Sequence, residues 1–115
     1  MAEDCLFCKI VAGEIPGEEV YSDEEVFAFR DINPAAPTHI LIIPKKHIER
    51  VDKAQPEDEA LMGRLLMKAN VIAEQEGLCD DGFRYVINTG GHGGQTVFHI
   101  HLHILGGRQM VWPPG

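Results

Sequence analysis

Histidines and aliphatic residues alternate strictly over five positions near the C-terminal end, in the run His99-Ile100-His101-Leu102-His103. Side chains along a β-strand point alternately to the two faces of its sheet, and same-face neighbours lie about 6.5–7 Å apart. The run therefore predicts a strand with three imidazoles on one face and aliphatic side chains in the core. A lone histidine is usually a solvated or core residue, but three in alternation directly after a glycine-rich loop indicate a functional site.

Two chemistries use such an array of imidazoles. Three neutral imidazoles can hold a catalytic zinc ion. Alternatively, one imidazole is a nucleophile, and a neighbour positions it or carries protons. The preceding segment 88–96 contains four glycines and no Asp or Glu, and such a loop lets backbone N–H groups surround an anion. A phosphate-binding loop beside a nucleophile favours phosphoryl or nucleotidyl transfer over metal-dependent hydrolysis.

Charge narrows the range of partners. The 115 residues include 10 Lys and Arg against 18 Asp and Glu, a net charge of −8, which argues against binding nucleic acid or an anionic membrane surface. A single small nucleotide is still compatible, because a few N–H groups hold one phosphate. There is no apolar run long enough to span a membrane, and Met1–Asp4 is acidic rather than signal-like. With three cysteines, we expect a cytoplasmic protein with reduced or metal-bound thiols.

The pattern of elements predicts an α+β fold in one domain, residues 1–115, with one long helix covering an antiparallel sheet. The helix is expected from Pro56 to a C-cap at Gly77. Its apolar stripe comprises Leu61, Leu65, Ala69, Ile72 and Ala73, broadened by Met62 and Leu66. Strands are expected at 19–22, 26–30, 39–44, 83–88 and 97–105.

Several motifs together resemble the Hint branch of the histidine-triad (HIT) superfamily. These motifs are the alternating run extended to 99–105, with 29–34, 37–39, 43–47, 93–98, 106–110 and 112–115. The resemblance implies a single HIT domain with a five-stranded antiparallel sheet, one long helix and a short N-terminal helix. It also implies a homodimer whose two sheets join into ten strands, an N-terminal segment 1–14 that carries possible zinc ligands, and a C-terminal tail 106–115.

The activity implied by the resemblance is hydrolysis of purine nucleoside phosphoramidates, in which AMP or GMP is joined to an amine. In that scheme His101 attacks the α-phosphate and forms a nucleotidyl-histidine that water then cleaves, without a catalytic cofactor. His103 contacts the phosphate. His39 stands behind His101 and accepts its second N–H, the arrangement of an activated nucleophile and its orienting partner.

Substrate contacts follow from the same resemblance. Asp31 would accept the ribose hydroxyls, and Trp112 of the tail would reach the partner's active site. The phosphate would be held by Asn88, Gly94, Gln95, Thr96 and Val97, where Thr96 keeps the hydroxyl of a serine common in relatives. The purine slot would be formed by Phe7, Ile10, Phe29 and Ile32, although each of these four residues is equally compatible with core packing.

The pair Cys5-Leu6-Phe7-Cys8 is a second constellation. A C-x-x-C pair by itself is compatible with a metal site, a redox pair or chance. Some bacterial members of the superfamily carry a similar pair and complete a Cys₂His₂ zinc site at the positions that correspond here to His47 and His99. The resemblance thus implies a closed structural zinc site that is dispensable for the chemistry. Cys79 is expected to be a small buried residue, and His92 a solvated loop residue.

Two rival functions remain open. One is hydrolysis of a dinucleoside polyphosphate, as in the Fhit-like branch of the superfamily. The other is a nucleotide-binding or protein-interaction module whose activity is incidental. The tail ending Trp112-Pro113-Pro114-Gly115 favours the phosphoramidate hydrolase over the Fhit-like enzyme. A complete triad with His39 argues against a binding module, because binding alone does not require an aligned nucleophile.

Overall fold

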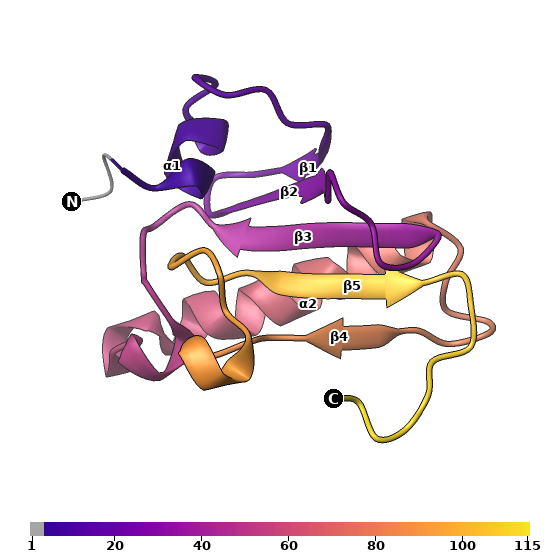
Figure 1. Ribbon diagram of the computed structural model, residues 1–115. Helices are drawn as coiled ribbons and strands as arrows, with labels where there is room; N and C mark the ends of the chain where they lie inside the picture. The colour runs from indigo at the N-terminus through magenta and orange to yellow at the C-terminus, as the bar shows by residue number, and fades with distance from the viewer. Residues whose placement is uncertain (1–3) are drawn as a thin grey trace.

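Five strands form one antiparallel sheet in the order β1-β2-β3-β5-β4, as the computed structural model shows for residues 4–115 (Figure 1). The strands are β1 (Glu19–Ser22), β2 (Val26–Arg30), β3 (Thr38–Pro44), β4 (Arg84–Val86) and β5 (Leu102–Gly106). Residues 1–3 lie outside the described range, so most of the acidic segment Met1–Asp4 does too. The expected α+β architecture, with one long and one short N-terminal helix, is confirmed.

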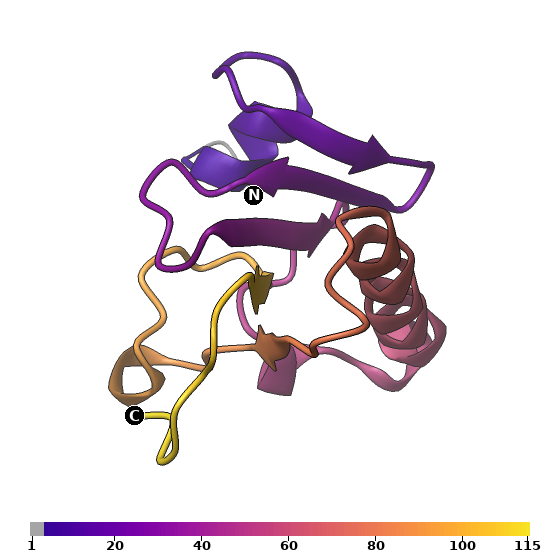
Figure 2. The ribbon, with the colours of Figure 1, turned by 90° about the vertical axis from the view of Figure 1, so that its right-hand side faces the viewer.

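Two helices cover opposite faces of this sheet (Figure 2). The long helix α2 (Glu59–Gln75) packs on the face formed by Val26 and Ala28 of β2 and their β3 neighbours. The short helix α1 (Leu6–Val11) places Phe7 on the other face, against Phe27 and Phe29. The two clusters use alternate residues of the same strands, as the pleat requires.

The long helix begins three residues later than its sequence pattern predicts. Pro56–Asp58 is a turn of 3₁₀ helix, in which the buried carboxylate of Asp58 accepts the Gln55 N–H at 2.9 Å and the Lys46 ammonium at 2.6 Å. The predicted stripe Leu61, Leu65, Ala69, Ile72 and Ala73 is buried. Leu66 does not belong to it, because its side chain is half exposed on the outer face. Gly77 follows the helix with φ +74°, as expected for this end.

The last two strands are shorter than predicted. The segment expected as a strand over 83–88 is paired only at Arg84–Val86, and the one over 97–105 is paired only from Leu102. The neighbouring strand β3 ends at Pro44, which has no N–H to donate. Before Leu102 the chain pairs with a different segment, and the Ile100 N–H donates to the Ile48 carbonyl at 2.8 Å. The strand predicted over 39–44 begins one residue earlier, at Thr38, so His39 lies inside β3 and not at its first position.

The segment after β5 is an irregular tail on the surface. The Arg84 guanidinium donates to the carbonyl of Val111 at 2.9 Å, and the side chain of Trp112 is 81 % exposed. Cys79, expected to be buried, is exposed in the loop after α2, so that expectation is wrong. None of the helices in residues 4–115 combines the length and the apolarity needed to cross a membrane.

Candidate active site

The alternation predicted for the histidine run is preserved although only its end belongs to β5. Ile100, Leu102 and Ile104 are buried in the cluster beneath α2. His103 pairs in register with Leu41 of β3, so it lies on the opposite face, the one covered by α1. The imidazoles are not solvated on an open sheet: His99 and His101 are buried, and His103 is partly so.

The ring of His101 is oriented by the backbone. Its Nδ1–H donates to the carbonyl of His99 at 2.8 Å, which leaves Nε2 as the nitrogen with a free lone pair. The edge of the Phe7 ring packs against it with centroids 5.0 Å apart. Burial lowers the pKa of His101, so the ring is neutral near pH 7. The expectation that His39 accepts the second N–H of His101 is wrong, because this N–H is taken by the backbone.

His39 instead forms a pair with His103. The Ala35 N–H donates to His39 Nδ1 at 3.0 Å, so the proton of neutral His39 is on Nε2. This Nε2–H then donates to His103 Nδ1 at 2.9 Å, and a carboxylate oxygen of Asp31 lies 3.4 Å from His39 Nε2. Burial, together with neighbouring His101 and His39, lowers the pKa of His103 to about 4. Neutral His103 therefore carries its proton on Nε2.

The Nε2 atom of His103 is buried and has no hydrogen-bond partner in residues 4–115. A buried N–H without an acceptor is costly and rare. At the centre of this cluster it offers a donor to a bound molecule. The site thus combines one ring with a free lone pair, His101, and one ring with a free N–H, His103.

The group Asp31, His39 and His103 brings three ligand-type atoms within 4.8 Å of one another, but it does not suit a metal ion. To bind a metal through Nε2, neutral His39 would need its proton on Nδ1. That atom already accepts the Ala35 N–H, so two hydrogens would face each other. These residues fit a proton-sharing network instead.

Cys5, Cys8, His47 and His99 form the other cluster of ligand atoms. The Nδ1 atoms of the two histidines are 3.2 Å apart, and three sulfur–nitrogen distances are 3.3, 3.4 and 3.5 Å. Tetrahedral zinc with bonds of about 2.3 Å to sulfur and 2.0–2.1 Å to nitrogen requires separations of about 3.5 Å for S···N and 3.3 Å for N···N. The four residues therefore fit this ion.

The protonation of His99 fits a metal ligand as well. Its Nε2–H donates to the Pro44 carbonyl at 2.7 Å, which leaves a lone pair on the Nδ1 that faces the cysteines. Burial, with the Cys5 thiol as neighbour, raises the pKa of Cys8 to about 11. A cation at this position would reverse that effect by stabilising the thiolate. Because the N-terminal helix begins at this cluster, its first turn is held next to the histidine run.

The glycine-rich loop before the histidines is closed on itself. The N–H groups of Gly94 and Gln95 donate to the carbonyls of Gly91 and Gly90 at 3.0 and 3.1 Å, so neither is free for a ligand. Among residues 4–115 we find no acceptor for the N–H groups of Thr96 and Val97. The half-buried side chain of Asn88 lies next to Gly94. Of the predicted phosphate contacts, Thr96 and Val97 thus keep free backbone donors, and the amides of Gly94 and Gln95 do not.

The four residues predicted for the purine slot differ in exposure. Phe7 and Phe29 are core residues of the α1-side cluster, with ring centroids 5.4 Å apart, and Ile10 packs against the same cluster. Ile32 is 92 % exposed in the loop after β2. The burial of the two phenylalanines agrees with core packing, and their contact with a purine stays a prediction. Asp31, at the start of this loop, accepts the Asn33 N–H at 2.8 Å with one oxygen.

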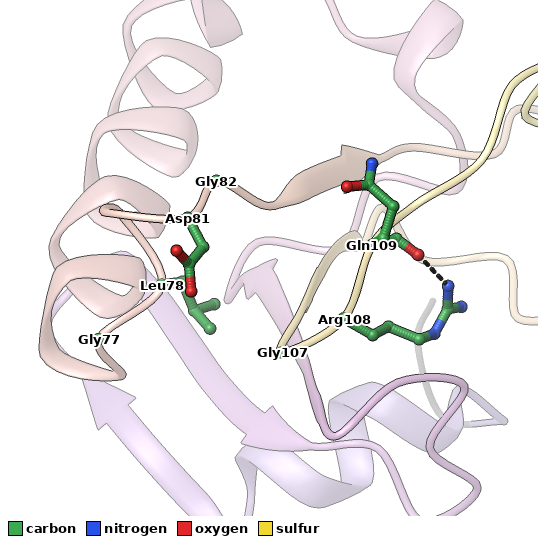
Figure 3. Close-up of a pocket in the computed structure, with 7 residues that line it drawn as sticks. All are labelled: Gly77, Leu78, Asp81, Gly82, Gly107, Arg108 and Gln109. Carbon is green, nitrogen blue, oxygen red and sulfur yellow. Dashed lines mark hydrogen bonds between the residues drawn. The ribbon is translucent and has the colours of Figure 1, made fainter.

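Two of the surface hollows differ in their relation to the histidines. The first, about 350 Å³ in volume, lies between the end of α2 and the start of the tail, away from the triad histidines (Figure 3). It is lined by Gly77, Leu78, Asp81, Gly82, Gly107, Arg108 and Gln109. The second, about 370 Å³, adjoins the Cys–His cluster and is lined by Asp4, Cys5, Leu6, His47, Thr96, Val97 and Phe98. Thr96 and Val97 can therefore be reached from solvent.

Sequence reasoning missed the groups that orient the rings. The Ala35 N–H and the carbonyls of Pro44 and His99 are backbone atoms, and no residue type marks them. Of the side chains, the role of Gln95 was missed: the prediction uses the backbone amides from Gln95 to Val97, whereas the structure buries the Gln95 side chain within the loop. A buried glutamine in a glycine-rich segment has no periodicity that would reveal it.

Comparisons with known proteins identify the family of the chain. The sequence profile described as HIT domain matches residues 12–110. The chain is 54 % identical over 110 residues to a purine nucleoside phosphoramidase of Escherichia coli K12, covering 96 % of this chain and 92 % of that protein. It is 56 % identical over 115 residues to an uncharacterized HIT-like protein of Synechocystis, over the full length of both.

Solved structures lead to the same family. The crystal structure of a HIT family hydrolase from Legionella pneumophila superposes with a TM-score of 0.95 at 55 % identity, over 96 % of this chain and 99 % of that one. A histidine triad protein from Clostridium difficile superposes with a TM-score of 0.92 at 43 % identity, over 95 % of each chain. With its alternating histidines on such a fold, the chain belongs to the HIT domain family, as a HIT hydrolase.

Proposed function

We propose that this protein hydrolyses purine nucleoside phosphoramidates through a nucleotidyl-histidine intermediate on His101. The observation that carries the proposal is the hydrogen bond from His101 Nδ1–H to the His99 carbonyl, because it leaves Nε2 unprotonated as a nucleophile. The name of the relative from Escherichia coli, purine nucleoside phosphoramidase, supports the choice of substrate.

In the first step His101 Nε2 attacks the α-phosphorus, and the bond between phosphorus and the amine nitrogen breaks. The departing nitrogen takes up a proton from solvent water, while the buried Nε2–H of His103 donates a hydrogen bond to a phosphate oxygen and keeps its proton. The pair formed with His39 holds the His103 ring. The new bond to phosphorus makes the His101 ring, which keeps its Nδ1–H, a cation, and the charge of the Asp31 carboxylate favours this cation. The products of this step are the free amine and the nucleotidyl-histidine.

In the second step water attacks the same phosphorus and the bond to His101 breaks. The nucleoside monophosphate leaves, one proton of the attacking water passes to solvent, and the ring of His101 returns to its neutral form. The free N–H groups of Thr96 and Val97 are suited to hold phosphate oxygens during both steps. Each Asp31 oxygen keeps a further acceptor site for the ribose hydroxyls.

The proposal is tested with a fluorogenic adenosine phosphoramidate and by mass spectrometry of protein quenched within milliseconds of mixing. We expect turnover, a transient AMP adduct on His101, and a loss of about 10³-fold or more in kcat for His101→Gly. Full activity of this variant would overturn the covalent mechanism. Faster turnover of a diadenosine polyphosphate than of the phosphoramidate would favour the Fhit-like function, and AMP binding without any turnover would favour a binding module.

We also propose that Cys5, Cys8, His47 and His99 hold a structural zinc ion. The support is the agreement of their separations with tetrahedral geometry and the protonation of His99. When bound, zinc supplies a cross-link between the N-terminal segment and the histidine run. Metal analysis of protein purified without chelators should give about one equivalent of zinc per chain, lost in Cys5→Ser and kept in Cys79→Ser. Metal-free protein would contradict the site.

Finally, we propose that the protein is a homodimer. Aliphatic side chains are exposed on the outer face of α2 and next to the edge strand β4, namely Leu66, Met67, Val71 and Ile87. An unpaired strand edge and exposed apolar side chains on one molecule are features that association buries. Trp112 on the exposed tail would then be free to reach the partner, as the resemblance implies.

A further inference from the structure

The side chain of Gln95 is buried inside the glycine-rich loop, with 5 % of the residue exposed. Its carbonyl oxygen accepts the Gly90 N–H at 2.8 Å. Its amide nitrogen donates to the carbonyls of Glu49 at 2.7 Å and Val97 at 3.0 Å. Both N–H hydrogens and the oxygen are used, which leaves the side chain no donor for a ligand.

These three bonds join three separate segments. Gly90 is the first residue of the loop turn, with φ +76°, and its carbonyl also accepts the N–H groups of Gly93 and Gln95. Glu49 belongs to the segment after β3. Val97 leads from the loop into the histidine run. The Gln95 carboxamide therefore ties both ends of the loop to the body of the protein.

Only a carboxamide of this length satisfies the position. With oxygen and nitrogen exchanged, an N–H group would face the Gly90 N–H and an oxygen would face two carbonyls. A glutamate would place its carboxylate against the same two carbonyls, and a methionine of equal length would leave all three backbone groups unpaired. The position thus selects glutamine for its backbone bonds.

We propose that Gln95 is a positioning residue, whose side chain fixes the backbone at Thr96 and Val97 so that their N–H groups bind the phosphate of the substrate. One bond of Gln95 goes to the Val97 carbonyl itself, and both residues border the hollow next to the Cys–His cluster. The inference rests on the proposed function, because it assumes that a nucleotide phosphate is the ligand. It assigns to Gln95 no contact with that ligand.

The experiment compares AMP with adenosine, which lacks the phosphate, by calorimetric titration of the full chain. In Gln95→Met we expect the Kd for AMP to rise by about tenfold or more, while the Kd for adenosine changes by less than about twofold. Gln95→Glu should weaken AMP binding further, because its charge opposes two carbonyls. The control Gln75→Met makes the same exchange at an exposed position at the end of α2 and should leave both constants unchanged.

Equal losses for AMP and adenosine, or unchanged AMP binding in a folded Gln95→Met, would overturn the inference. If both variants unfold, the wild-type protein decides: AMP, but not adenosine, should shift the backbone amide resonances of Thr96 and Val97, and their failure to shift would overturn it. Failure of the proposed function looks different. In that case the wild-type protein turns over no phosphoramidate, whatever residue occupies position 95.

Discussion

For three rings of the site, one backbone group decides which nitrogen carries the proton. The carbonyl of Pro44 accepts the Nε2–H of His99, and the carbonyl of His99 accepts the Nδ1–H of His101. The Ala35 N–H donates to Nδ1 of His39, so the proton of that ring lies on Nε2. As a result, His99 presents a lone pair to the cysteines, His101 has a free lone pair on Nε2, and His103 has a free N–H. Three similar residues in alternation therefore differ in which atoms they can offer to a ligand.

Replacing His39 should impair catalysis more than binding. In His39→Ala the Nδ1 of His103 loses its donor, so the ring no longer has a fixed orientation or protonation. We expect kcat for the phosphoramidate to fall by about 10²-fold, with a smaller change in KM. His92→Ala, in the exposed part of the loop, serves as the control. A change in KM alone would contradict the role given to His39.

His103 should make the folded protein less stable in acid. Its pKa is lowered to about 4 by burial and by His101 and His39, against the opposite effect of Asp31, while the unfolded chain titrates near 6.5. Between these values the unfolded state binds more protons, so the free energy of unfolding falls as the pH drops from about 6.5 to 4. The thermal midpoint of His103→Asn should decline less steeply over this range. Parallel curves for the two proteins would be evidence against the shift.

At the scale of elements, the sequence predicts all five strands and the long helix in the right order. The family resemblance also implies that His47 lies near His99 and that His39 lies near the histidine run, and both groups come together in the structure. It overestimates the last strand, because alternation reports which face a side chain occupies and not which backbone it pairs with. Ile100 keeps its place in the core while its N–H turns to Ile48. The pairing of His39 with His103 depends on the register of β3 and β5, which local pattern does not encode.

The buried stripe of α2 should account for much of its attachment to the sheet. Ile72 of α2 is fully buried between the helix and the sheet. Ile72→Ala should lower the free energy of unfolding by about 2–5 kcal/mol, because apolar burial is lost and a cavity is left behind. Glu74→Ala, on the exposed side of the same helix, should change it by about 0.5 kcal/mol or less. Urea denaturation measures both. Similar losses for the two variants would contradict the assigned faces.

At the scale of the whole molecule, the larger apolar core and the candidate active site lie on opposite faces of the sheet. The larger apolar cluster lies between the sheet and α2, whereas the histidines His39, His101 and His103 lie on the other side with α1. The net charge of −8 is compatible with a phosphate ligand here, since the proposed contacts are neutral imidazoles and backbone N–H groups.

The outer face of α2 should carry the dimer contact. Met67 is 62 % exposed there, and Met67→Lys would bury an unpaired charge in the proposed interface. Light scattering after gel filtration should give a dimer for the wild-type protein and a monomer for this variant. Glu14→Lys, exposed near α1 on the opposite face, should remain dimeric. A wild-type monomer at micromolar concentration would contradict the homodimer.

The carbonyl of His99 that accepts the His101 N–H belongs to the main chain, and every amino acid carries one. Mutation at position 99 can therefore remove the proposed zinc-binding imidazole and still leave His101 its acceptor. A chain without both cysteines and the first histidine would keep the backbone atom that orients the ring of His101. The proposed zinc site and the proposed nucleophile are thus free to evolve at different rates.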